Sequence, residues 1–138
     1  MLLSLLLLNL EAAGPDTIPD AFTFTDQTDV AVSSTITSAA ITVAGIDSAA
    51  TITVTGGEYD INASGTFVSS SGTVDNGDTV RARHTSSASY LTAVNTVVTI
   101  GGVSDTFTST TVAAPAVAYP TPRRRHALPR RIRRHVRA

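Results

Sequence analysis

The sequence predicts an all-β sandwich of about seven strands, and three observations lead to this prediction. The composition is rich in Thr, Ser, Val, Ala and Gly, with one Met and no Trp, which favours pleated sheet over helix. Between Phe22 and about Thr111, apolar residues alternate with Thr, Ser or Arg, as they do in half-buried strands. Turn signals interrupt the alternation about every 8 to 12 residues, a spacing typical of sandwiches.

Apolar residues two positions apart define the expected inner side of each strand, because they point to the same face of a sheet. The pairs that share a side are Phe22 and Phe24, Ile41 and Val43, Ile52 and Val54, Val80 and Ala82, and Val98 and Ile100. We expect these pairs to form the core.

Six short polar or glycine-rich stretches mark the expected turns. They are residues 45–48, 56–57, 62–65, 75–78, 86–89 and 101–102. Asn76-Gly77 is the strongest of these signals, because both residues tolerate the positive φ of a tight hairpin. Tyr90, which precedes the run that ends at Ile100, is predicted to form a tyrosine corner, with its hydroxyl bonded back to the chain.

The chain of 138 residues has room for one domain and three parts are expected. Residues 1–19 form an apolar N-terminal arm and linker, residues 20–111 the sandwich, and residues 112–138 a proline-containing linker and an Arg-rich C-terminal arm. Proline and glycine at positions 14, 15 and 19 mark the first linker. The chain has no cysteine, which excludes a disulfide, a thiolate metal site and a cysteine nucleophile.

The N-terminal arm begins with MLLSLLLLNL, a run that contains seven leucines. A membrane span needs about 20 apolar residues, so the run is too short to cross a bilayer. It could be a secretory signal followed by the small residues 12–14, although no basic residue precedes it, or it could cover the open end of its own sandwich. Leaving the leucines in water would forfeit on the order of 10 kcal/mol. We therefore expect them to bind a partner protein, through Leu2, Leu3, Leu5, Leu6, Leu7, Leu8 and Leu10.

Charge is strongly segregated along the chain. Residues 1–122 hold two Arg and all eleven acidic residues, a net charge of −9, whereas the last sixteen residues carry +8. The positive charge comes from Arg123, Arg124, Arg125, Arg130, Arg131, Arg133, Arg134 and Arg137. Because Arg pairs well with carboxylates, we expect this arm to bind an acidic surface on a neighbouring protein or on another copy of the chain. Nucleic acid is the alternative partner, bound with steep salt dependence and little base readout.

Residues that could carry chemistry are few. His84 closes an expected strand without a partner motif and is predicted to be a surface or rim residue. Asp75, Asn76 and Asp78 could suggest Ca²⁺, but they lack the spacing of a calcium loop and are predicted to shape a turn. We therefore predict a non-enzymatic protein with no catalytic residue, no metal and no cofactor.

Charged residues also alternate along two of the expected strands. Glu58 and Asp60 point the same way and are predicted to form a solvated edge that discourages aggregation. Arg81 and Arg83 are predicted to lie on the outward face of their strand.

About two thirds of the chain, from residue 22 to residue 111, resembles the immunoglobulin-like repeat modules of large bacterial surface and secreted proteins. The likeness is carried by ITVAGI (41–46), TITVTGGEYDIN (51–62), SGTVDNGDTV (71–80), SSASY (86–90) and TIGGVSDTF (99–107). The resemblance implies an immunoglobulin-like β-sandwich, here with extended terminal arms. Related modules occur singly on tailed-phage virions, as capsid decoration or as appendages of tail proteins. No catalytic or ligand residue comes with the likeness.

A single module with two arms is more similar to a virion part than to an array of surface repeats. We therefore expect a structural protein of a tailed-phage virion, foremost a capsid decoration or cement protein, present in many copies. Its expected partners are the major capsid protein or neighbouring copies, bound through the two arms. The alternatives are a secreted or surface-attached bacterial adhesion module and a nucleic-acid-associated protein that uses the Arg-rich arm.

Overall fold

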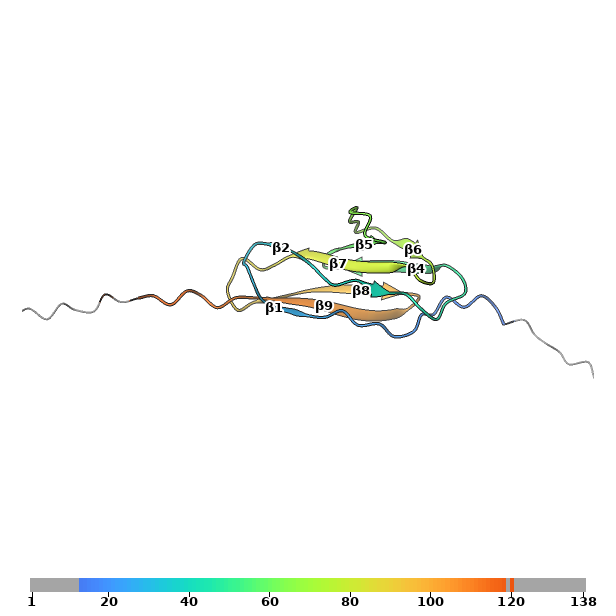
Figure 1. Cartoon of the computed structure of the whole chain (residues 1–138), viewed down its shortest axis with the longest axis horizontal. Helices are drawn as coiled ribbons and strands as arrows, with labels where there is room; N and C mark the ends of the chain where they lie inside the picture. The colour runs from blue at the N-terminus through green and yellow to red at the C-terminus, as the bar shows by residue number, and fades with distance from the viewer. Residues whose placement is uncertain (1–12, 119, 121–138) are drawn as a thin grey trace, which may run out of the picture.

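The computed structural model describes residues 13–118 and Pro120, and these residues contain nine strands and no helix. The strands form two sheets in a sandwich-like arrangement (Figure 1). Their bounds are β1 (Gln27–Val30), β2 (Thr35–Thr37), β3 (Ile41–Thr42), β4 (Ala50–Thr55), β5 (Glu58–Ile61), β6 (Gly72–Val74), β7 (Thr79–Thr85), β8 (Ala93–Ile100) and β9 (Val103–Thr111). The all-β prediction is confirmed, with nine strands in place of about seven. No helix in the described part of the chain could span a membrane.

The larger sheet has five strands in the order β1-β9-β8-β4-β6. Its pairs are antiparallel except for β1 and β9, which run parallel. The smaller sheet is built around β7, with β2 and β3 along one edge and β5 along the other. The long β8–β9 hairpin therefore lies in the middle of the larger sheet, and β7 lies in the middle of the smaller sheet.

Ser38 joins β2 to β3 along the edge of β7. Its N–H donates to the Ala82 carbonyl (2.8 Å), and the Ala82 N–H donates to the Ser38 hydroxyl oxygen (2.9 Å). A side-chain oxygen thus takes the place of a backbone carbonyl, which explains why the edge is divided into two short strands.

The core lies between the sheets, where the inward side chains of both meet. Twelve hydrophobic residues are buried there, and Phe107, Ile52 and Ile100 are the largest of those that are fully enclosed. Each predicted apolar pair contributes at least one buried residue, and the half-buried members of the pairs pack against the cluster. Each large side chain that is removed from water contributes about 1.5–3 kcal/mol. The predicted inner faces are confirmed.

All six predicted turns lie between consecutive strands. Gly101 and Gly102 make the two-residue turn between β8 and β9, with φ values of 54° and 89°. A Cβ at Gly101 would collide with the Thr17 carbonyl oxygen. Glycine is therefore required there both by the backbone conformation and by the chain segment that passes it.

Two aromatic residues enter the core from outside the strands. Phe22 and Phe24 precede β1, and their rings meet edge to face with centroids 6.0 Å apart. The Phe24 N–H donates to the Asp105 carboxylate (2.7 Å). The Asp105 carboxylate thus holds the segment before β1 in place, although this segment pairs with no described strand.

The predicted tyrosine corner is wrong. Tyr90 is 43% exposed, and its hydroxyl makes no hydrogen bond within the described residues. The buried Thr111 hydroxyl fastens this corner instead, because it donates to the Ser89 carbonyl (2.7 Å) and accepts from the Thr92 N–H (2.9 Å). Leu91 has a φ of 50°, and this positive-φ residue makes the turn next to the exposed Tyr90.

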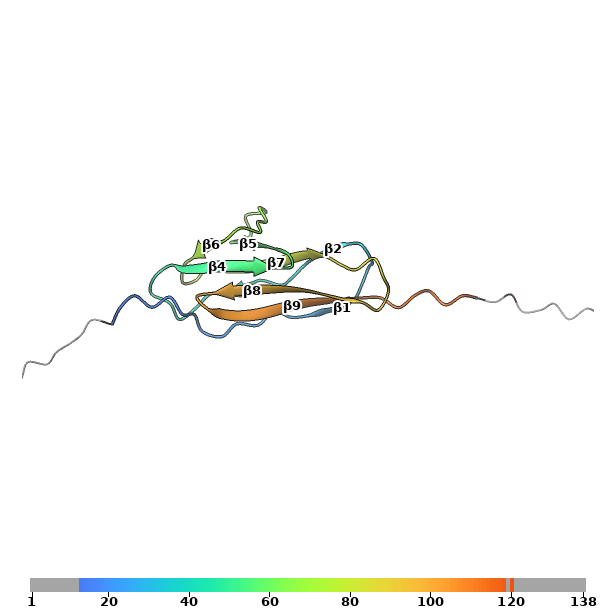
Figure 2. The same cartoon turned by 180° about the vertical axis from the view of Figure 1, so that it is seen from behind.

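The chain contacts the sandwich from Asp16 to Val112. The Asp16 N–H donates to the Asp47 carboxylate (2.7 Å), and the Val112 N–H donates to the Val30 carbonyl (2.9 Å). Beyond these contacts, the two ends of the described chain leave from opposite ends of the sandwich (Figures 1 and 2).

Candidate functional site

The fifteen side chains predicted to bind partners lie outside the described residues. They are the seven leucines between Leu2 and Leu10 and the eight arginines between Arg123 and Arg137. The described residues offer three other features: a charged face on β5 and β7, a histidine between the sheets, and an uncharged face on the larger sheet. Within this part of the chain, no three histidine, aspartate or glutamate side chains gather as a metal site requires.

The ion-pair face is the outward side of β5 and β7, formed by Glu58, Asp60, Arg81 and Arg83. The register places Glu58 opposite Arg83 and Asp60 opposite Arg81. The Arg83 guanidinium donates two hydrogen bonds to the Glu58 carboxylate (2.6 and 3.1 Å), and Arg81 donates to Asp60. The outward position of both arginines is confirmed, and each is paired across the strands with a carboxylate.

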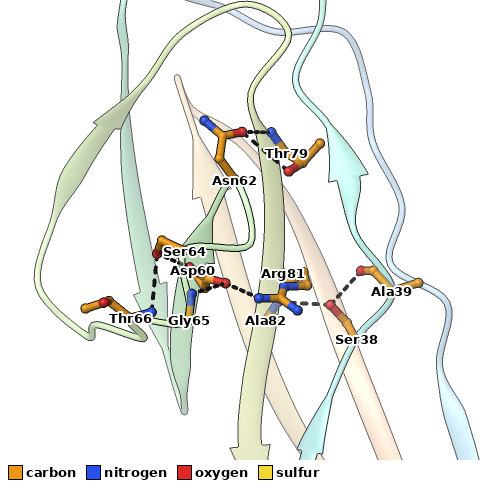
Figure 3. A network of polar contacts seen from close by, with 10 residues as sticks. All are labelled: Ser38, Ala39, Asp60, Asn62, Ser64, Gly65, Thr66, Thr79, Arg81 and Ala82. Atoms are coloured by element: carbon orange, nitrogen blue, oxygen red, sulfur yellow. Dashed lines mark hydrogen bonds and ion pairs between the residues drawn. The ribbon is translucent and has the colours of Figure 1, made fainter.

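The sequence predicted that Asp60 would belong to a solvated edge, and this prediction is wrong. The Asp60 side chain is fully enclosed. The segment after β5 turns back over it, so that the Ser64 hydroxyl (2.5 Å) and the Gly65 N–H (3.4 Å) both donate to its carboxylate (Figure 3). Burial raises the pKa of Asp60, but the hydrogen bonds from Ser64, Arg81 and Gly65 and the charge of Arg81 outweigh it. The net pKa is lowered, so the carboxylate stays ionised.

Phe67 and Val68 complete this cover over the ion-pair face. The Phe67 ring centroid lies 3.8 Å from the Arg83 guanidinium carbon, within the range of a cation–π contact. Val68 and Tyr59 exchange two backbone hydrogen bonds of 2.9 Å, so the edge of β5 is paired at this point. The charges of the face therefore fasten the chain between β5 and β6 onto the sheet.

Asp75 and Asp78 shape the turn between β6 and β7, as predicted. The Asp78 carboxylate accepts from the Asp75 N–H (2.8 Å) and from the Asn62 side-chain amide (2.7 Å). These two hydrogen bonds, against a smaller effect of burial, lower the pKa of Asp78. Gly77 completes the turn with a φ of 93°. The carboxylate of Asp78 therefore serves the turn and the neighbouring loop.

His84 is buried between the sheets, so the prediction of a surface or rim residue is wrong. It is 7% exposed, and its ring lies against Phe107 with centroids 5.0 Å apart. Nδ1 is 2.7 Å from the Thr96 hydroxyl oxygen, and Nε2 is 2.6 Å from the Ser109 hydroxyl oxygen. The signal was present in the sequence: His84 continues the inward series of Val80 and Ala82.

The hydroxyl partners fix how the imidazole is protonated. Thr96 donates its one hydroxyl hydrogen to the Gly56 carbonyl (3.2 Å), so it accepts from Nδ1–H of His84. Nε2 is then the acceptor of the Ser109 hydroxyl. Burial lowers the pKa of His84, in agreement with a neutral ring.

The serine–histidine pair has the spacing of a nucleophile and its base, but it is sealed. Ser109 and Thr96 are both 0% exposed, so no substrate atom reaches either hydroxyl in this fold. An open groove of about 520 Å³ borders this site, and its lining residues are Thr35, Gly56, Gly57, Glu58, Arg83, His84 and Thr85. A molecule in that groove would meet the Glu58–Arg83 ion pair and glycine backbone, since both imidazole nitrogens are already hydrogen-bonded.

The threonine face is the outward side of β4, β6, β8 and β9. It comprises Thr51, Thr53, Thr55, Thr73, Ala93, Asn95, Val97, Thr99, Ser104, Thr106, Thr108 and Thr110. Eight of the twelve residues are threonine and none is charged. At one end of the face the register sets threonine against threonine or serine, because Thr51 lies opposite Thr73 and Thr99 lies between Thr53 and Ser104. Elsewhere threonines lie opposite Val97, Asn95 or Ala93. The alternating pattern predicted these positions to be polar, but it did not single the face out as a site.

Known sequences do not assign this chain to a family: no family model matches it, and no curated protein does.

Proposed function

We propose that this chain is a non-enzymatic structural protein that links components of a tailed-phage virion, foremost as a capsid decoration or cement protein. The observation that carries the linking role is that the two ends of the described chain leave from opposite ends of the sandwich. The sequence continues into a leucine-rich segment on one side and an arginine-rich segment on the other. On this proposal, the sandwich links two segments of different chemistry that bind different partners.

The chemistry of the described residues supports a non-enzymatic role. The histidine with a neighbouring serine is enclosed between the sheets, and its ring nitrogens are both hydrogen-bonded. The carboxylates of the ion-pair face are paired with arginines. The enclosed serine–histidine pair offers no accessible nucleophile, and the exposed Glu58 carboxylate is engaged by Arg83.

The strand order supports an immunoglobulin-like assignment of the sandwich. In that fold, three strands C, F and G face a sheet that contains B, E and D. The neighbouring strands β4, β8 and β9 correspond to C, F and G. In the other sheet, β2 and β3 together correspond to B, β7 to E and β5 to D. The proposed setting is supported by this assignment and by the resemblance of residues 22–111 to bacterial immunoglobulin-like repeat modules, relatives of which occur singly on virions.

Truncation of each arm tests the proposal. A chain that starts at Pro15 keeps the hydrogen bond between Asp16 and Asp47, and one that ends at Pro122 keeps the contact between Val112 and Val30. We expect both to fold with an unchanged melting temperature and to be lost from purified virions, as measured by quantitative mass spectrometry. A full-length chain with Thr42→Glu, an exposed residue on β3, is the control and should be incorporated. Normal incorporation of both truncated chains would overturn the proposal.

Copy number, chain length and nucleic-acid binding separate the alternatives. A large copy number per particle places the protein on the capsid, and a few copies place it on the tail or neck. A chain cut near Gly14 in a bacterial envelope fraction would favour the adhesion module. Nucleic-acid binding that falls steeply with salt and is lost when the C-terminal arginines become serine would favour the third role.

A further inference from the structure

We propose that the threonine face is a docking surface for the same face of a second copy of this chain. Thr51, Thr53 and Thr55 of β4 are exposed, as are Thr73 on β6 and Asn95 on β8. In the described part of the chain, no segment covers this side of the larger sheet. The proposal concerns the sandwich itself and does not depend on the arms or on the virion setting.

Charge selects this face over the other one. Residues 1–122 carry a net charge of −9, so a contact between two sandwiches that brings their acidic side chains together is unfavourable. The twelve residues of the threonine face bring no charge into a contact, and Asp26 and Asp29 lie only along its β1 edge. Packing the ion-pair face against a copy would instead require the desolvation of the exposed Glu58–Arg83 ion pair, which costs several kcal/mol per ion. The threonine face is where two copies meet at the lowest electrostatic cost.

The chemistry of threonine favours a copy of the face itself as the partner. In a two-fold symmetric contact the same patch must complement itself. A threonine hydroxyl is both donor and acceptor, and the methyl group beside it packs against another methyl group. Thr99 and Ser104 already show such a contact within the face, with their hydroxyl oxygens 2.7 Å apart. Hydroxyls that meet across the interface can satisfy one another in the same way.

Other partner classes find little on this face. It has no aromatic ring on which a sugar or a base could stack, and no carboxylate or cation. Asn95 is its single amide. A hollow of about 370 Å³ at one end is lined only by threonine, alanine and glycine residues, including Thr51, Thr53 and Thr99. Glycan and nucleic acid are therefore less suited to the face than a second copy.

The size of the face sets the expected strength. The paired strands lie about 4.8 Å apart and rise about 3.4 Å per residue, so four strands of this length present roughly 500 Å². Stable interfaces bury about 800 Å² per partner. We therefore expect a weak, reversible dimer with a dissociation constant of roughly micromolar or above, one that forms where many copies are held close together.

Sedimentation equilibrium of the full-length chain tests the pairing. We expect the chain to dimerise as its concentration is raised, and the double variant T53E/T106E to weaken the dimer about a hundredfold, because like charges then meet across the contact. The matched control T42E/T85E adds the same charges to exposed threonines of the smaller sheet and should dimerise like the unaltered chain. A chain that stays monomeric, or a dimer that T53E/T106E leaves unchanged, would overturn the proposal.

Cysteine cross-linking gives a second readout that does not depend on added charge. The chain has no cysteine, so single variants at Thr53, Thr99 and Thr106 report only on contacts between copies. Under mild oxidation we expect at least one of them to form a disulfide-linked dimer, and Thr42→Cys on the smaller sheet to stay monomeric. If none of the three exceeds the control, the faces do not meet. Whether the truncated chains are incorporated into virions has no effect on these dimerisation results. The two proposals are therefore tested separately.

Discussion

The two outward faces of the sandwich follow the same alternating pattern and differ in what their side chains bind. On the ion-pair face, every charged side chain of β5 and β7 is paired within the chain, and the segment after β5 is fastened over it. On the threonine face, the hydroxyls are uncharged and no described segment covers them. Charge here holds the protein's own loop in place, whereas the uncharged face is left open, as the proposed contact between copies requires.

Asp60→Ala should have the largest effect on stability. It would leave Arg81 without its carboxylate and the Ser64 hydroxyl and Gly65 N–H without their acceptor. We expect the free energy of unfolding, measured by urea denaturation, to fall by about 3 kcal/mol. Glu58→Ala is the matched control: its ion pair with Arg83 is partly exposed, so a loss of about 0 to 1 kcal/mol is expected. Equal losses for the two variants would show that the buried Asp60–Arg81 pair contributes no more to stability than the exposed Glu58–Arg83 pair.

As the pH falls, protonation of His84 between the sheets should destabilise the fold before protonation of Asp60 on the ion-pair face does. Burial lowers the pKa of His84 from 6.5, so the unfolded chain binds this proton at higher pH than the folded chain. Stability is unaffected by His84 above pH 6.5 and declines as the pH falls from there to the folded pKa, by at most about 1.4 kcal/mol per pH unit. The lowered pKa values of Asp60 and Asp78 act from a lower starting pH, because the stability that they contribute is lost as the pH falls below 3.8.

His84→Gln identifies the upper window. Urea denaturation between pH 7.5 and about pH 4.5 should show the decline in the unaltered chain and a flat profile in the variant, with His126 and His135 present in both. A variant that keeps the full decline would show that other groups cause it.

Phe67→Ala tests how the loop is held over the ion-pair face. The contact of the ring with Arg83 should contribute about 1 kcal/mol, and its loss should speed proteolytic cleavage in residues 62–70. Phe67→Leu keeps an apolar side chain without the π-system, so it separates the cation–π contact from simple burial. Cleavage at the unaltered rate in Phe67→Ala would show that the contacts of Asp60 and Val68 hold the loop without the Phe67 ring.

Thr106→Val should have the smallest effect. The side chain points outward from β9, where substitutions usually change the free energy of unfolding by less than about 0.5 kcal/mol. Thermal unfolding at low protein concentration is the measurement, because a dimer would add stability of its own. A large loss in the dilute chain would mean that the hydroxyl serves the fold itself.

The parts of the structure that repeat along the chain were predictable from sequence, and the parts that depend on distant residues were not. A period of two places Val80 and Ala82 inward wherever the strand lies, and glycine marks the turns because of its backbone freedom. The polar contacts of His84 come from β8 and β9, 12 and 25 residues further along the chain, so no local pattern announces them. The same holds for Asp60, whose burial depends on how the segment after β5 turns back. The predicted partner-binding residues of both arms remain predictions.

The parallel pairing of β1 with β9 has a mechanical consequence. Gln27 lies beside Ser109 and Val30 beside Thr111, and the Val112 N–H donates to the Val30 carbonyl. Because the chain leaves at opposite ends, tension between those ends would slide these two strands along each other and strain their hydrogen bonds together instead of peeling them apart in sequence. Resistance to such a pull is governed by the rate of unfolding and not by the equilibrium stability. The sandwich would therefore hold under a stretching force that acts along the line between its two exits.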